Sequence, residues 1–133
     1  MRIAYVTIHV APEIMQGGVG KKIKSHMSIW RERGHEVSLF SLTPAEIPFQ
    51  GERQFVFDAK TSLLKRETNR ASGLMRMLAS VREYKPDVIY LRFGLYSYPL
   101  HRLFNIAPVV LEVNSDDRVE YSTRGKFFYW MNR

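Results

Sequence analysis

The sequence has 133 residues, 45% of them hydrophobic and 25% charged, and its 20 Lys and Arg outnumber 13 Asp and Glu to give a net charge of +7. These values are typical of one folded domain and exclude a disordered chain. The absence of cysteine excludes disulfides, a thiol nucleophile and a cysteine-based zinc site. No apolar run approaches the roughly 20 residues that span a bilayer, and the N-terminus lacks a signal-peptide pattern, so we expect a cytoplasmic protein.

The first forty residues predict a strand, a glycine-rich loop, a helix and a second strand. The continuous apolar run Arg2–Ile8 indicates a strand that is buried on both faces. A loop over His9–Gly18 leads to a helix over Val19–Arg33, whose apolar positions recur every three or four residues. Gly34 is suited to end that helix, and Glu36–Leu42 is the second strand.

Strands and helices continue to alternate in the rest of the chain. A loop rich in proline and glycine precedes a short strand over Phe55–Phe57, and a long helix follows over Ser62–Tyr84. The remaining predicted elements are a strand at Val88–Leu91, a short helix at Pro99–Phe104, a strand at Pro108–Val113 and a helical tail at Asp116–Arg133. This alternation predicts a doubly wound, mostly parallel sheet of five strands, and right-handed crossovers favour the order 3-2-1-4-5.

The segment Gly17-Gly18-Val19-Gly20-Lys21 is the first candidate site. It is not a Walker A loop because Lys22 stands where serine or threonine is needed, and it lacks the third glycine of the dinucleotide fingerprint. One explanation is a tight turn that needs glycine. The other, which we favour, is a close approach of Gly17 and Gly18 to an anionic group, with help from the helix dipole and from Lys21 or Lys22.

Polar residues at the end of the fifth predicted strand form the second candidate site, Leu111-Glu112-Val113-Asn114-Ser115-Asp116-Asp117. Helix capping explains the last three residues but not Glu112, which is costly inside a strand unless it is paired. The segment Arg92–Tyr98 either covers the core or supplies contacts to a sugar or a phosphate. His9 is the one histidine predicted at the ligand-binding edge of the sheet.

The sequence lacks the motifs of several kinds of catalytic site and of nucleic-acid binding. The four histidines show no metal spacing. No catalytic triad or nucleophile elbow is recognisable, so any chemistry is expected to rely on positioning and electrostatics rather than on covalent catalysis. No zinc finger, helix-turn-helix or aromatic-interleaved basic strand is present, so we expect no nucleic-acid partner.

Together these segments resemble the N-terminal domain of a GT-B fold glycosyltransferase, of the large retaining group often called family 4. The resemblance covers nearly the whole chain and rests on the order and spacing of its segments rather than on any one motif. The segments that carry it are Arg2–Val6, Gly17–Gly20, Arg33–Val37, Lys85–Tyr90 and Pro108–Asn114.

The resemblance implies that residues 1–133 form a single Rossmann-like, acceptor-side domain, the N-terminal half of the GT-B fold. The C-terminal, donor-binding domain would be absent, so the chain would be a fragment that is inactive alone. The whole enzyme would move a hexosyl-type sugar, with retention of configuration, from a nucleotide-sugar to a glycan or lipid-linked acceptor. No cofactor and no metal are expected, and the nucleotide-sugar is the donor substrate.

The resemblance also implies roles for individual residues. Gly17 and Gly18 would face the donor phosphates and sugar, and Lys21 and Lys22 would contact anionic groups. Contacts to the acceptor or the sugar would come from Glu112, Asn114, Arg92 and His9. Asn114 stands where many members have a histidine that interacts with the transferred sugar, so the resemblance assigns no catalytic residue.

Three further hypotheses concern another function, membrane contact and self-association. A stand-alone flavodoxin-like binding or interaction module is the second functional hypothesis, although the loop after the first strand has no hydroxyl-bearing residue before Lys24. The basic face of the Ser62–Tyr84 helix is either a solvated face, which we favour, or a surface for anionic lipid at the inner face of the membrane. The aromatic cluster Phe127–Met131 predicts self-association of the fragment.

Overall fold

The computed structural model describes residues 1–8, 12–45, 53–93 and 96–113 of the chain. Two of the predicted site residues, His9 and Asn114, lie outside these ranges. So does the predicted tail helix Asp116–Arg133, together with its aromatic cluster Phe127–Met131.

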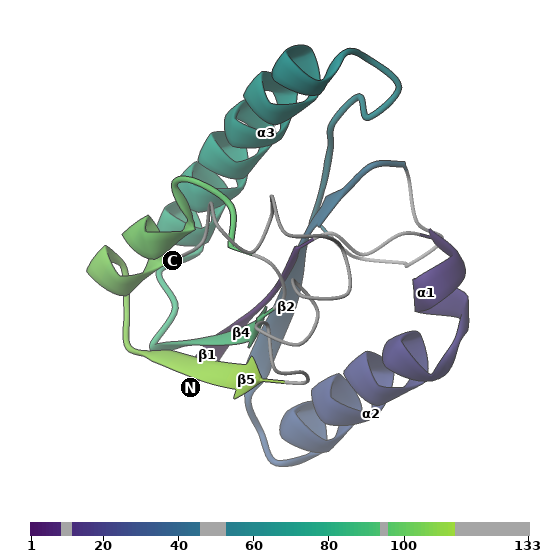
Figure 1. Ribbon diagram of the computed structural model, residues 1–133. Coiled ribbons are helices and arrows are strands. Elements are labelled where there is room, and N and C mark those ends of the chain that lie inside the picture. The colour runs from purple at the N-terminus through teal and green to yellow at the C-terminus, as the bar shows by residue number, and fades with distance from the viewer. Residues whose placement is uncertain (9–11, 46–52, 94–95, 114–133) are drawn as a thin grey trace.

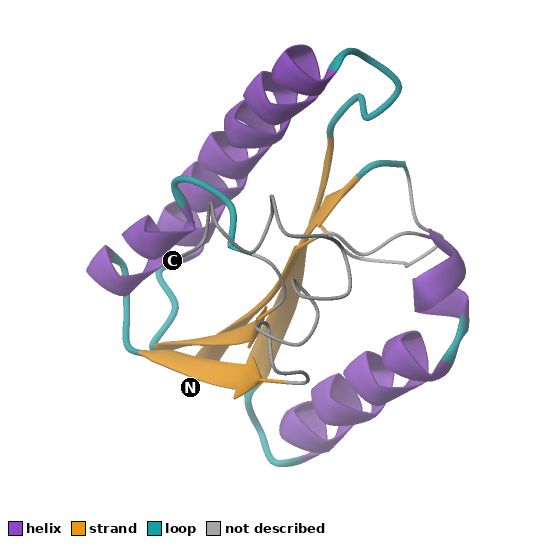
Figure 2. Ribbon diagram, viewed as in Figure 1, coloured by secondary structure: helices purple, strands orange, loops and turns teal. Residues whose placement is uncertain are grey.

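A five-stranded parallel sheet forms the centre of the described fold (Figures 1 and 2). Its order is β3-β2-β1-β4-β5, which confirms the predicted class and strand order. The strands are β1 (Arg2–Ile8), β2 (Glu36–Thr43), β3 (Arg53–Val56), β4 (Val88–Phe93) and β5 (Val109–Val113).

Helices cover both faces of the sheet (Figure 1). One face is covered by α1 (Pro12–Gln16) and α2 (Gly18–Glu32), and the other by α3 (Leu63–Tyr84) and the 3-10 helix η1 (Leu100–Asn105). Alternate residues of β1 serve the two cores, since strand side chains alternate between faces. Tyr5 packs with Ile23 and Met27 of α2, and Val6 belongs to the core formed with α3.

The ends of the two long helices follow their sequence signals. Gly34, with a φ of +82°, adopts the left-handed conformation directly after the last turn of α2, as predicted. Lys85 ends α3 in the left-handed conformation with a φ of +52° and precedes Pro86, which cannot continue a helix. On α3 an apolar stripe is buried, with Leu74, Met77, Leu78 and Val81 all at most 5% exposed.

The structure corrects four predicted elements. The loop before α2 contains the short helix α1. Strand β3 is Arg53–Val56 rather than Phe55–Phe57, because pairing with Phe40–Thr43 fixes its register while the sequence signal follows only the apolar residues. Strand β4 continues to Phe93, and the short helix before β5 is a 3-10 helix. Within the described ranges, no helix is both long and apolar enough to cross a membrane.

Candidate functional site

Residues paired in register across neighbouring strands form rows on the sheet face beneath α2. These rows are apolar or aromatic until the row near the carboxyl ends of the strands, which is polar. The preceding rows on the central strands are apolar and aromatic: Ile3, Tyr5, Val37, Leu39, Val88 and Tyr90. The next row, read from β3 to β5, is Gln54, Ser41, Thr7, Arg92 and Glu112, and each residue is paired in register with its neighbour. Residues paired in this way project from the same face, so a polar row crosses the whole sheet close to its carboxyl edge.

The middle of this polar row lies where the strand order reverses. The chain passes from β1 to β2 on one side and from β4 to β5 on the other, and ligands of open α/β sheets bind at the carboxyl ends of such strands. Thr7 of β1 and Arg92 of β4 are directly paired at this point. The hydroxyls of Thr7 and Ser41 are 2.9 Å apart and fully buried, so they satisfy each other inside the protein.

Glu112 is the centre of a cluster with Arg92, Lys22 and Tyr5, called here the Glu112 cluster. Its Oε1 accepts hydrogen bonds from Arg92 Nη1 and from Lys22 Nζ, both at 2.6 Å, and its Oε2 accepts one from the Tyr5 hydroxyl at 3.3 Å. The Glu112 side chain is 8% exposed, that of Arg92 15% and that of Lys22 47%. These bonds explain how an acid is tolerated inside β5.

Burial and charge act in opposite directions on the Glu112 carboxyl. Burial raises its pKa, but the hydrogen bond from Lys22 and the charges of Arg92 and Lys22 outweigh this effect, so that its pKa lies below the ordinary value of 4.5. Burial, followed by the negative charge of Glu112, raises the pKa of Tyr5 and of Tyr90. At neutral pH the cluster therefore contains one anion, two cations and one neutral phenol, with one excess positive charge.

This lowered pKa predicts how stability depends on acid. A carboxyl with a lower pKa in the folded state stabilises the protein above its unfolded pKa, and the contribution disappears as the pH falls through the folded pKa. We expect the difference in unfolding free energy between the wild type and Glu112→Gln to shrink from pH 7 towards about pH 3. Denaturant titrations at several pH values measure it, and a difference that is constant over this range would contradict the assigned ionisation.

The glycine segment lies at the start of α2, above the polar row. Gly17 is the N-cap with φ −90° and ψ −158°, which is extended backbone that any residue adopts. A Cβ on Gly18 would meet no atom within 4 Å, whereas a Cβ on Gly20 would lie 1.7 Å from the carbonyl oxygen of Met15 in α1. The requirement for glycine therefore comes from helix packing at Gly20, and the described structure gives no such requirement at Gly17 or Gly18.

The structure brings together some of the predicted site residues and separates others. Arg92 and Lys22 each contact Glu112 directly, and Gly18 lies one helical turn before Lys22 on α2. Lys21 is exposed on α2, and no contact to the Glu112 cluster is described for it.

Sequence reasoning missed the polar partners inside the strands. Tyr5, Thr7, Ser41 and Tyr90 lie in runs that look uniformly apolar or aromatic. The alternation of side chains along a strand places Thr7 and Ser41 at core-facing positions. A buried hydroxyl there needs a hydrogen-bond partner, so the sequence did contain a sign that each has one. Which residue supplies that partner depends on the register between strands, and this is visible only in the fold.

No protein-family model matches this sequence, and no curated protein is significantly similar to it. The fold and the site define a class in structural terms, namely an α/β protein with an open parallel sheet. Its polar, positively charged cluster lies at the carboxyl edge of that sheet, beneath the first turns of α2.

Proposed function

We propose that this chain is the acceptor-side domain of a glycosyltransferase that uses a nucleotide-sugar donor and a glycan or lipid-linked acceptor. The observation that carries the proposal is the position of the Glu112 cluster at the point where the strand order reverses. A nucleotide-sugar presents phosphates and hydroxyls. The cluster offers an excess positive charge for the phosphates, and Arg92 and Glu112 offer donors and acceptors for hydroxyls.

The start of α2 supports the same proposal. The first N–H groups of a helix have no partner within the helix and carry its positive dipole end, which favours an anionic group. At Gly18 the backbone is open to close approach, whereas the N–H of Gly17 already donates to the carbonyl oxygen of Ile14. Lys22 lies on the next turn and reaches Glu112, so phosphate and sugar contacts would adjoin each other.

The strand order argues against the flavodoxin-like alternative. Flavodoxin-like sheets have the order 2-1-3-4-5, whereas 3-2-1-4-5 is the first part of the six-stranded dinucleotide-binding order. A module of that alternative class has no feature in its favour in the described residues.

We place the proposed enzyme in the cytoplasm, at the inner face of the membrane if its acceptor is lipid-linked. The basic face of α3 gives this membrane contact limited support, because several of its side chains have partners within the protein. Arg66 and Arg70 pair with Glu67, and Arg76 donates a hydrogen bond to the carbonyl oxygen of Val56.

Calorimetry with a panel of UDP- and GDP-sugars and the full-length gene product tests the proposed function. We expect one donor to bind, and we expect Lys22→Gln to weaken it about tenfold, since a charge-assisted phosphate contact is lost. Lys60→Gln is the matched control, because Lys60 is also an exposed lysine but lies far along the chain, after β3. Absence of binding across the panel would refute the proposal.

A further inference from the structure

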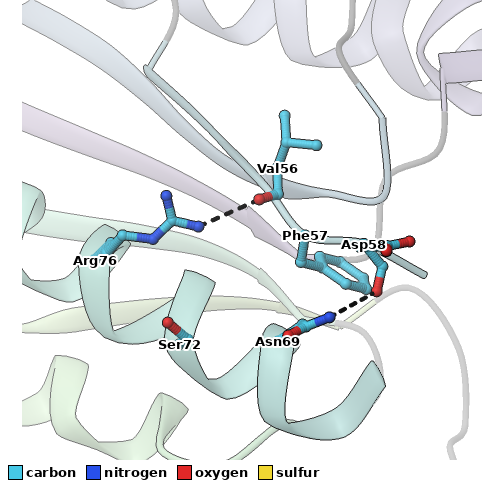
Figure 3. Close-up of a pocket in the computed structure, with 6 residues that line it drawn as sticks. All are labelled: Val56, Phe57, Asp58, Asn69, Ser72 and Arg76. Carbon is cyan, nitrogen blue, oxygen red and sulfur yellow. Dashed lines mark hydrogen bonds between the residues drawn. The ribbon is translucent and has the colours of Figure 1, made fainter. Parts of the chain in front are cut away.

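A pocket of about 250 Å³ lies between the end of β3 and the middle of α3 and shares no residue with the Glu112 cluster (Figure 3). Val56, Phe57 and Asp58 form one wall. Asn69, Ser72 and Arg76 of α3 form the other, and their spacing of three and four positions places them on one face of the helix.

Two hydrogen bonds hold the walls together, and both are drawn in Figure 3. Arg76 Nη2 donates to the carbonyl oxygen of Val56 at 3.2 Å, and Asn69 Nδ2 donates to that of Asp58 at 3.4 Å. The backbone N–H of Lys60 donates to Asp58 Oδ1 at 2.9 Å. These bonds fix the lining groups before any ligand arrives, which reduces the cost of ordering them on binding.

The lining contains every kind of hydrogen-bonding group that hydroxyls use. The Asp58 carboxylate only accepts, the Arg76 guanidinium only donates, and the amide of Asn69 and the hydroxyl of Ser72 do both. The charges of Asp58 and Arg76 cancel, so the pocket does not select a charged ligand. Val56, whose side chain is exposed, adds an apolar group against which C–H groups can pack, while Phe57 is buried in the core beneath the pocket.

We propose that this pocket binds one neutral sugar ring. Its volume is below the range of about 300–1,000 Å³ that encloses larger ligands, which suits a single ring better than a nucleotide. The proposal goes beyond the transferase function, because it needs neither a donor nor the Glu112 cluster. A glycan acceptor is one source of such a ring.

Titration of the ¹⁵N-labelled chain with methyl glycosides of glucose, galactose, mannose and N-acetylglucosamine, followed by NMR, tests this proposal. We expect saturable shifts of backbone amides in residues 56–58 and 69–76 for at least one glycoside, with millimolar affinity. Ser72→Trp, at an exposed helix position, fills the pocket and should abolish these shifts. Arg76→Ala should weaken binding about tenfold, whereas Arg82→Ala, an exposed arginine of the same helix outside the pocket, should not change it.

Two kinds of result would overturn the proposal. One is the absence of saturable shifts at these amides, or shifts that persist unchanged in Ser72→Trp. The other is tighter binding of inorganic phosphate than of any glycoside at the same amides, which would make the pocket an anion site. Neither result bears on donor binding at the Glu112 cluster, so failure here is distinguishable from failure of the proposed function.

Discussion

Gly20→Ala is expected to destabilise the protein by about 3 kcal/mol or more, because the added methyl group meets backbone rather than a side chain that can move. The new Cβ would lie 1.7 Å from the carbonyl oxygen and 2.6 Å from the carbonyl carbon of Met15. Relief requires α1 to move away from α2, and this would displace Met15, which is 4% exposed and belongs to the core beneath α2.

The matched control for this change is Gly18→Ala, two residues earlier in the same helix. Its Cβ meets no atom within 4 Å, and alanine favours helix over glycine, so we expect a change of at most about 1 kcal/mol in either direction. Urea denaturation followed by circular dichroism compares the two variants. Equal effects of both substitutions would contradict the close approach of α1 to α2.

Glu112→Ala is expected to cost about 3–5 kcal/mol in unfolding free energy, the range for removing one partner of a buried ion pair. Most of this loss of stability comes from Arg92. Its side chain is 15% exposed and would keep its charge without the carboxylate that lies at 2.6 Å. Lys22 is 47% exposed and can turn to solvent, so Lys22→Ala should cost much less.

Glu36→Ala is the control for Glu112→Ala, because Glu36 is also a strand glutamate that pairs with an arginine. The pair joins Arg2 and Glu36 at 3.4 Å with side chains 41% and 61% exposed, so we expect a loss of at most about 1 kcal/mol. Guanidinium denaturation at neutral pH measures both variants. A loss at Glu112 no larger than that at Glu36 would show that the cluster is not a buried ion pair.

Much of the fold could be predicted from the sequence because its signals are local. The apolar run of β1 and the 3.6-residue periodicity of α2 identify elements within a few residues, and Gly34 marks a helix end. The alternation of strands and helices, with right-handed crossovers, then restricts the strand order. The β3 segment was misplaced because pairing with β2, rather than its own composition, decides where that strand starts and ends.

The candidate site could be predicted only in part, because its geometry is set by cross-strand register. Glu112 could be identified because an acid inside a strand needs a partner. Arg92 and Lys22 could be identified because they follow a predicted strand and a glycine-rich loop. Their meeting depends on residues 20 and 90 positions apart. The sequence suggests one role for the glycines of residues 17–20, namely close approach to a ligand. In the structure Gly20 is required by the packing of α1 against α2, whereas Gly18 has open space around it.

The central claim is that the cluster at the carboxyl edge of β1, β4 and β5 receives an anionic sugar ligand, and NMR mapping tests it most directly. Titrating the full-length gene product, ¹⁵N-labelled over residues 1–133, with the nucleotide-sugar that calorimetry selects should shift the amides of residues 17–22 and those of Arg92 and Glu112. These shifts should weaken in Lys22→Gln and persist in Lys60→Gln. Shifts confined to other parts of the molecule, or none at saturating donor, would contradict the claim.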